Sequence, residues 1–123
     1  MAFDAQSLTI AGRVIFGGFF LIAGIRNFLH FGERKVLPTN YGWPLGSLTA
    51  LGFAAQLLGG ASLILNVWTA AGATLLIAFL VPATALYHNL FMFKGRERDP
   101  HLYLTLVNIA LVGGLLLIIA DAL

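Results

Sequence analysis

The chain has no cysteine, and only 10% of its 123 residues are charged. The absence of thiols excludes, within this chain, a disulfide framework, thiol catalysis, a Cys-ligated iron–sulfur cluster and a thiolate zinc site. The net charge of +2 provides no basic surface of the kind that nucleic acids require, so we expect no nucleic-acid partner. Any redox chemistry therefore needs an organic cofactor or a partner protein.

Hydrophobic residues make up 59% of the chain, and the mean hydropathy is +0.91. The charges are almost all excluded from four long apolar stretches. A helix of roughly 20 apolar residues crosses a hydrocarbon core of about 30 Å. The sequence therefore predicts an all-α fold, a polytopic membrane four-helix bundle that forms one transmembrane domain over residues 1–123, with helices at approximately 8–31, 46–65, 68–93 and 101–120.

Three short segments outside the apolar stretches indicate where the spans begin and how they are joined. Residues 1–7 contain no basic residue, so we expect the first span to be retained rather than removed as a secretory signal. Residues 66–67 are almost the only link between the second and third spans, which predicts a tight antiparallel hairpin. Asp99 followed by Pro100 is typical of an N-cap and first helical position, and predicts the start of the fourth span.

Four crossings place both termini on one side of the membrane and the loops 32–45 and 94–100 on the other. Five of the seven basic residues lie at these two loops, although Arg13 lies near the opposite end of the first span. The positive-inside rule then makes both loops cytoplasmic and both termini external. Tyr41 and Trp43 in the first loop are residue types that favour the headgroup interface.

Small residues recur within the spans. Pairs of glycines occur in three of them, at residues 17–18, 59–60 and 113–114, and small side chains allow close approach of helices in membranes. Pro82 in the third span cannot donate a backbone hydrogen bond, so it frees a carbonyl one turn earlier. We therefore expect close packing of the bundle and a bend in the third helix.

Each span carries one strongly polar side chain in the loop-side half of the membrane. At 1.5 Å per helical residue, these side chains lie roughly 7 to 15 Å from the loop-side helix ends. His30 follows Arg26 by one helical turn and lies on the same face of the first span, nearer the surface, where it can serve as an entry group. A cation, two amides and an imidazole can together hydrogen-bond a carbonyl, a hydroxyl or a carboxylate. The predicted ligand-binding residues are Arg26, Gln56, His88, Asn108 and His30, with no catalytic residue assigned.

Each of these residues also has a purely structural interpretation. Arg26 can extend its guanidinium to the headgroups. Gln56 and Asn108 can join helices through hydrogen bonds without binding anything else. His88 can pair within the bundle, since Thr84 lies one turn away.

Three histidines, His30, His88 and His101, all fall toward the loop side, which raises the question of a metal or haem. None has a carboxylate or second histidine at ligand spacing, and haem b between helices requires two histidines at matched depth. We therefore expect no metal site.

The chain resembles the DoxX family of small four-helix membrane proteins over nearly its whole length. The similar segments are residues 12–31, 51–65, 78–91 and 106–118. The order and spacing of six features carry the resemblance: Arg26, Gln56, Pro82, His88, Asn108 and the glycine pair at 113–114. The family often has glutamate where this chain has Gln56, and an amide at that position cannot relay protons by ionising.

The resemblance implies a bacterial inner-membrane protein, and some members of the family are membrane subunits of quinone-linked, sulfur-oxidising or redox-protective assemblies. We interpret the chain as a small subunit that binds a quinone-like amphipathic molecule in a polar intramembrane pocket and supports a partner's redox chemistry. The alternative is a non-catalytic accessory subunit that packs on larger membrane proteins or on copies of itself. A small transporter ranks third, because no inverted repeat is evident.

Overall fold

The computed structural model describes residues 4–34, 46–88, 90 and 93–123. Tyr41, Trp43 and most of the loop 32–45 lie outside the described residues. The elements, in chain order, are α1 (Ala5–Leu29), α2 (Phe31–Arg34), α3 (Gly46–Leu65), α4 (Thr69–Tyr87), the 3-10 turn η1 (Gly95–Glu97) and α5 (Arg98–Ala122). The described part of the chain contains no strand, which confirms the all-α prediction.

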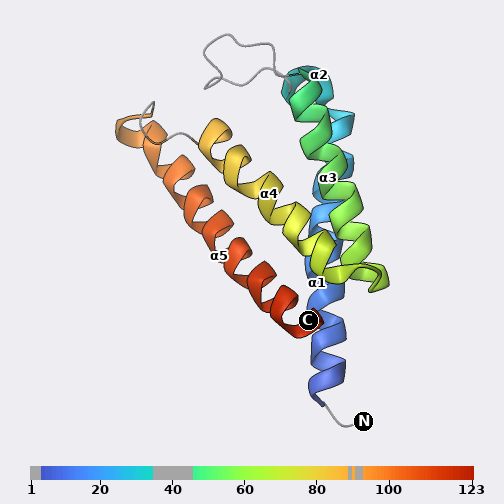
Figure 1. Ribbon diagram of the computed structural model, residues 1–123. Helices are drawn as coiled ribbons and strands as arrows, with labels where there is room; N and C mark the ends of the chain where they lie inside the picture. The colour runs from blue at the N-terminus through green and yellow to red at the C-terminus, as the bar shows by residue number, and fades with distance from the viewer. Residues whose placement is uncertain (1–3, 35–45, 89, 91–92) are drawn as a thin grey trace.

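Four of the helices, α1, α3, α4 and α5, are long and apolar enough to cross a membrane. They follow one another up and down, so the N- and C-termini lie at the same end of the molecule and α2 and η1 lie at the other (Figure 1). We call these the termini side and the loop side. This arrangement confirms the predicted four-helix membrane bundle.

The first helix begins three residues before the predicted start at residue 8, because Asp4 caps it. The Asp4 carboxylate accepts a hydrogen bond from the Ser7 backbone N–H at 2.8 Å, which satisfies one of the free amides of the first turn. The helix ends at Leu29 instead of residue 31, and the short α2 follows after His30.

The predicted boundaries around the second loop require two corrections. The third long helix ends at Tyr87 and not at residue 93, because the chain leaves the helical path at His88 (φ −125°, ψ 43°) and turns toward α5. The fourth begins at Arg98 and not at residue 101, since η1 leads directly into it. Asp99 is therefore not the N-cap but lies in the first turn of α5, where a carboxylate still complements the helix dipole.

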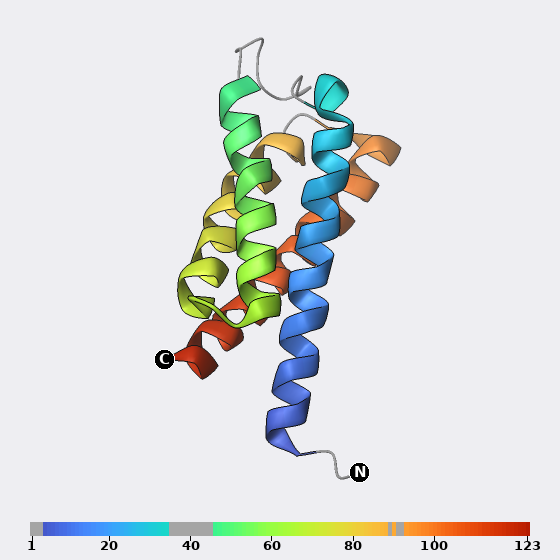
Figure 2. The same cartoon turned by 90° about the vertical axis from the view of Figure 1, so that its right-hand side faces the viewer.

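The four long helices pack in sequence, with α1 against α3, α3 against α4, and α4 against α5. The shared core lies in the termini-side half. It is formed by Phe20, Leu63, Ala73, Leu76, Leu80 and Leu115. Toward the loop side, the α4 and α5 pair leans away from α1 and α3 (Figure 1), whereas α1 and α3 run side by side over most of their length (Figure 2). The helices therefore converge in the termini-side half, where the core lies, and the two pairs separate toward the loop side.

Glycines explain where the helices approach most closely. A methyl group at Gly17 of α1 would lie 2.6 Å from the Gly60 carbonyl oxygen of α3, so only glycine allows this backbone contact. Gly59 of α3 packs in the same way against Leu76 of α4, and Gly114 of α5 packs against the ring of Phe16. Each pair thus contributes at least one glycine to packing, as the sequence predicted, whereas Gly18 and Gly113 have no neighbouring atom within 4 Å of the position of a Cβ.

The link between α3 and α4 is the predicted tight turn. Asn66 and Trp68 both adopt left-handed backbone conformations, with φ of 54° and 50°. The Ser62 hydroxyl donates to the carbonyl oxygens of Val67 and Trp68, and the Thr69 hydroxyl donates to the Asn66 side-chain oxygen at 2.6 Å. The polar groups of this turn are therefore largely satisfied within the turn itself.

Candidate functional site

An apolar cleft of about 230 Å³ opens between α3 and α4 in the loop-side half of the bundle. It arises where α4 leans away from α3, above the close contact of the two helices at Gly59 and Leu76. Its walls consist mostly of leucine, alanine and phenylalanine side chains, including Phe53, Phe79 and Leu86. We refer to it as the α3–α4 cleft.

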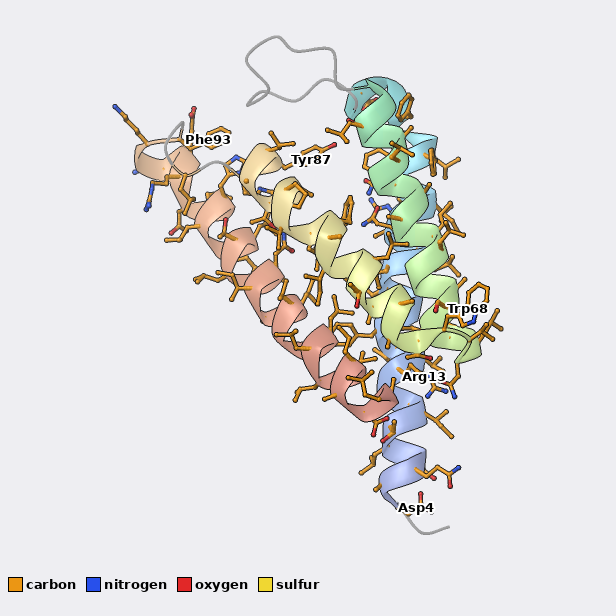
Figure 3. All side chains as sticks on the ribbon, in the orientation of Figure 1. Asp4, Arg13, Trp68, Tyr87 and Phe93 are labelled. Carbon is orange, nitrogen blue, oxygen red and sulfur yellow. The ribbon has the colours of Figure 1, made fainter. Side chains whose placement is uncertain are left out.

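Three polar groups belong to residues that line this cleft. Thr49 of α3 is buried, and Tyr87 extends from the end of α4 toward the side on which α3 lies (Figure 3). Pro82 has no backbone N–H, so the Ala78 carbonyl cannot receive its usual helical hydrogen bond, and both residues line the cleft. The residues that line the cleft therefore include two with hydroxyl groups, Thr49 and Tyr87, and one, Ala78, whose backbone carbonyl lacks its helical donor.

Three of the five polar residues predicted from the sequence, Gln56, Asn108 and His88, lie at helix interfaces beside the cleft. Gln56 is buried between α1 and α3, at 5% exposure, and its side-chain oxygen accepts a hydrogen bond of 2.6 Å from the Asn27 amide. Asn27 was not among the ligand-binding residues predicted from the sequence. Its position could have been found, because it lies three residues after Gly24, on the buried face of α1.

Asn108 of α5 lies at the interface with α4. Its amide donates to the Thr84 hydroxyl at 2.9 Å, and that hydroxyl in turn donates to the Leu80 carbonyl at 2.6 Å. The Thr84 oxygen thus acts as acceptor and donor at once, and the amide of Asn108 is held in one orientation.

His88 lies one turn beyond Thr84 on the same interface. Its Nδ1 lies 2.9 Å from Nδ1 of His101 on α5, so one ring must donate and the other accept. The ring of Phe93 stacks on His101, with centroids 3.7 Å apart. His88 is the first residue after α4, and burial, followed by the charge of His101, lowers the pKa of His88.

Arg26 and His30 are exposed near the loop-side end of α1. The structure therefore brings His88 and Asn108 to one interface and Gln56 to another, and it does not place Arg26 in an interior with them. None of these five residues lines the α3–α4 cleft. Their part in binding a ligand stays a prediction.

The described residues contain no group of three or more histidine, aspartate or glutamate side chains placed to hold a metal ion. His88 and His101, which the sequence spacing did not pair, lie together in the structure with their Nδ1 atoms 2.9 Å apart.

The model of the DoxX family matches residues 8–89, about two thirds of the chain. No curated protein and no solved structure matches the chain. The matched region contains most of α1 and all of α2, α3 and α4, and therefore the whole α3–α4 cleft.

Proposed function

This chain belongs to the DoxX family, and we propose that it binds a quinone-like amphipathic molecule in the α3–α4 cleft and so supports the redox chemistry of a partner protein in a bacterial inner membrane. The observation that carries the proposal is the cleft itself, an apolar space of about 230 Å³ with a few polar groups, within a chain that spans the membrane. Ligand sites commonly combine apolar walls with a small number of placed polar groups.

The polar groups of the cleft suit both redox forms of such a molecule. The hydroxyls of Thr49 and Tyr87 can donate to the carbonyl oxygens of a quinone. The Ala78 carbonyl can accept from the hydroxyl of a quinol, because Pro82 withholds its helical donor. The apolar walls and the neighbouring lipid accommodate the hydrocarbon tail.

The histidine pair adjoins this site through Tyr87, whose ring centroid lies 6.5 Å from that of His88. Reduction of a quinone requires two electrons and two protons, and imidazole titrates in the range where protons can be exchanged at physiological pH. A redox partner supplies the two electrons, while His88 and His101 deliver the two protons from the loop-side surface toward the cleft. Gln56 and Asn108 hold the helices on the two sides of the cleft through their hydrogen bonds to Asn27 and Thr84.

The test is the quinone content of the purified protein. We expect the wild type, extracted from bacterial membranes in a mild detergent, to retain quinone in native mass spectrometry. Ala78→Phe places a ring in the cleft and should remove most of it. Ala110→Phe makes the same change at an exposed position of α5 that does not line the cleft, and should leave the content unchanged. Equal quinone content in the two variants would overturn the proposal.

A second function, that of an accessory subunit without a ligand, is favoured by the exposure of α5. This helix contributes one buried residue, Leu115, and leaves large apolar side chains such as Ile109 and Leu117 exposed. Another membrane protein, or a second copy of this chain, could pack there. In that case Ala110→Phe, and not Ala78→Phe, should weaken the assembly seen by native mass spectrometry.

A further inference from the structure

A second hollow of the described structure lies at the termini side, away from the α3–α4 cleft. It has a volume of about 1230 Å³ and is bounded by the first half of α1, the turn before α4 and the end of α5. We call it the termini-side hollow. Two residues of opposite charge line it, Arg13 from α1 and Asp121 from α5.

Arg13 is fixed in position by α3. Its Nε donates to the Leu63 carbonyl oxygen at 2.8 Å, in the last turn of that helix (Figure 3). This bond uses one of the five N–H donors of the guanidinium, so the remaining donors are available to a ligand in the hollow. Asp121 is exposed and lies two residues from the C-terminus.

The backbone adds further donors on the same wall. Residues 69–71, the first turn of α4, line the hollow, and Trp68 provides no side-chain cap for their amides. The N-terminus of a helix attracts anions through its free N–H groups and its dipole. Together with Arg13, it makes this part of the hollow suited to a phosphate.

The hollow lies at the depth of lipid headgroups. Arg13 is level with the last turn of α3, and the ends of α4 and α5 lie on the same side. Trp68 is 84% exposed there, as expected of an aromatic residue at the membrane interface. Residues 5–12 of α1 extend about 12 Å beyond this level.

The deeper wall of the hollow is apolar. Phe16 of α1 and Leu117 and Ile118 of α5 line it, which provides a surface for hydrocarbon chains. The ligand that this site fits is thus an amphipath with a phosphate, a nearby cation and acyl chains.

We infer that the termini-side hollow binds a phospholipid with a zwitterionic, ammonium-bearing headgroup, that is, a phosphatidylethanolamine. Its phosphate lies against Arg13 and the first turn of α4, and its ammonium group donates to the Asp121 carboxylate. Phosphatidylglycerol has no cation to pair with Asp121, because its headgroup offers only neutral hydroxyls and the lipid keeps a net negative charge. The quaternary ammonium of phosphatidylcholine has no N–H to donate.

The test measures lipid selectivity by native mass spectrometry of the full chain in detergent, with phosphatidylethanolamine, phosphatidylglycerol or phosphatidylcholine added at equal concentration. We expect phosphatidylethanolamine to be retained most strongly. Asp121→Asn should lower the ratio of bound phosphatidylethanolamine to phosphatidylglycerol about fivefold, the loss expected of one partly exposed ion pair. Asp99→Asn, a matched change on the loop side, should leave the ratio unaltered.

Arg13→Gln should weaken all three phospholipids, because each has a phosphate, and Arg96→Gln serves as its control. If Arg13→Gln fails to fold for lack of its bond to Leu63, Asp121→Asn still decides the question, since Asp121 is exposed at the end of α5. Soluble glycerophosphoethanolamine should not displace the lipid at equal concentration. Displacement by it, or a wild-type ratio that Asp121→Asn does not change, would overturn the inference.

Discussion

Asn27 on α1 donates a hydrogen bond of 2.6 Å to the side-chain oxygen of Gln56 on α3, in the half of the bundle where α4 has already leaned away. The bond joins two helices that are long and apolar enough to cross a membrane, and Gln56 is buried between them. It requires only an acceptor oxygen at position 56.

The first prediction is that Gln56→Glu preserves this link, because a carboxyl group still offers an oxygen to Asn27, whereas Gln56→Leu removes it. Hydrogen bonds between helices in membranes contribute about 0.6 kcal/mol on average and up to about 1.7 kcal/mol. We therefore expect Gln56→Leu to lower the unfolding temperature modestly, measured by thermal unfolding in one detergent, and Gln56→Glu to lower it less. The opposite order would show that the side chain at position 56 does not serve as an acceptor for Asn27.

The second prediction concerns two adjacent glycines of α1. Gly17→Ala forces its methyl group against the Gly60 carbonyl oxygen of α3, so the helices must separate, at a cost of about 1 to 3 kcal/mol. Gly18→Ala meets no atom within 4 Å and should be neutral or stabilising by up to about 1 kcal/mol. Thermal unfolding of the two variants tests this difference, and equal midpoints would contradict the observed α1–α3 contact.

The third prediction is a pH dependence of stability. Burial, and then the charge of His101, lower the pKa of His88 in the folded protein, so the unfolded chain takes up this proton first as the pH falls. The stabilisation is therefore complete above the usual histidine pKa and is lost as the pH falls through it. We expect the unfolding temperature to fall between about pH 7.5 and about pH 5.5, with a smaller fall in His88→Gln. An identical pH profile in the variant would assign the effect to another group.

The fourth prediction concerns orientation in the membrane. The chain has no cysteine, so single cysteines report without background. Glu97→Cys on the loop side should resist a membrane-impermeant thiol reagent in intact bacteria, while Leu123→Cys should react, because the basic residues favour a cytoplasmic loop side. Labelling of position 97 alone would place the loops outside.

The fold could be predicted from the sequence because each long helix corresponds to one long apolar stretch and most of the charged residues lie in the loops. The face of α1 that packs against α3 could also be predicted from the sequence. Arg13, Gly17, Phe20, Gly24 and Asn27 follow one another at intervals of four and three residues, which is one stripe of a helix. Arg26 lies off this stripe and is exposed, whereas the structure places Arg13 and Asn27 in contact with α3.

The contacts of α4 with α5 and the α3–α4 cleft could not be predicted in the same way. The pairing of His88 with His101 depends on how the chain turns after Tyr87, which no periodicity encodes. The cleft depends on the angle between two helices. Near the turn, Gly59 lets α3 and α4 come into close contact, and farther from the turn the bulky side chain of Phe79 holds the two helices apart. The angle therefore depends on side chains of both helices together.

The short turn from Asn66 to Trp68 has a consequence for how the protein enters the membrane. The stretch from residue 46 to residue 93 contains no aspartate, glutamate, lysine or arginine, and the turn satisfies its polar groups internally. Moving one elementary charge across a membrane potential of 100 mV involves about 2.3 kcal/mol, but this hairpin carries no side-chain charge across during biosynthesis. Its insertion is therefore insensitive to the membrane potential, and the charged segments that flank it retain sole control over which way it faces.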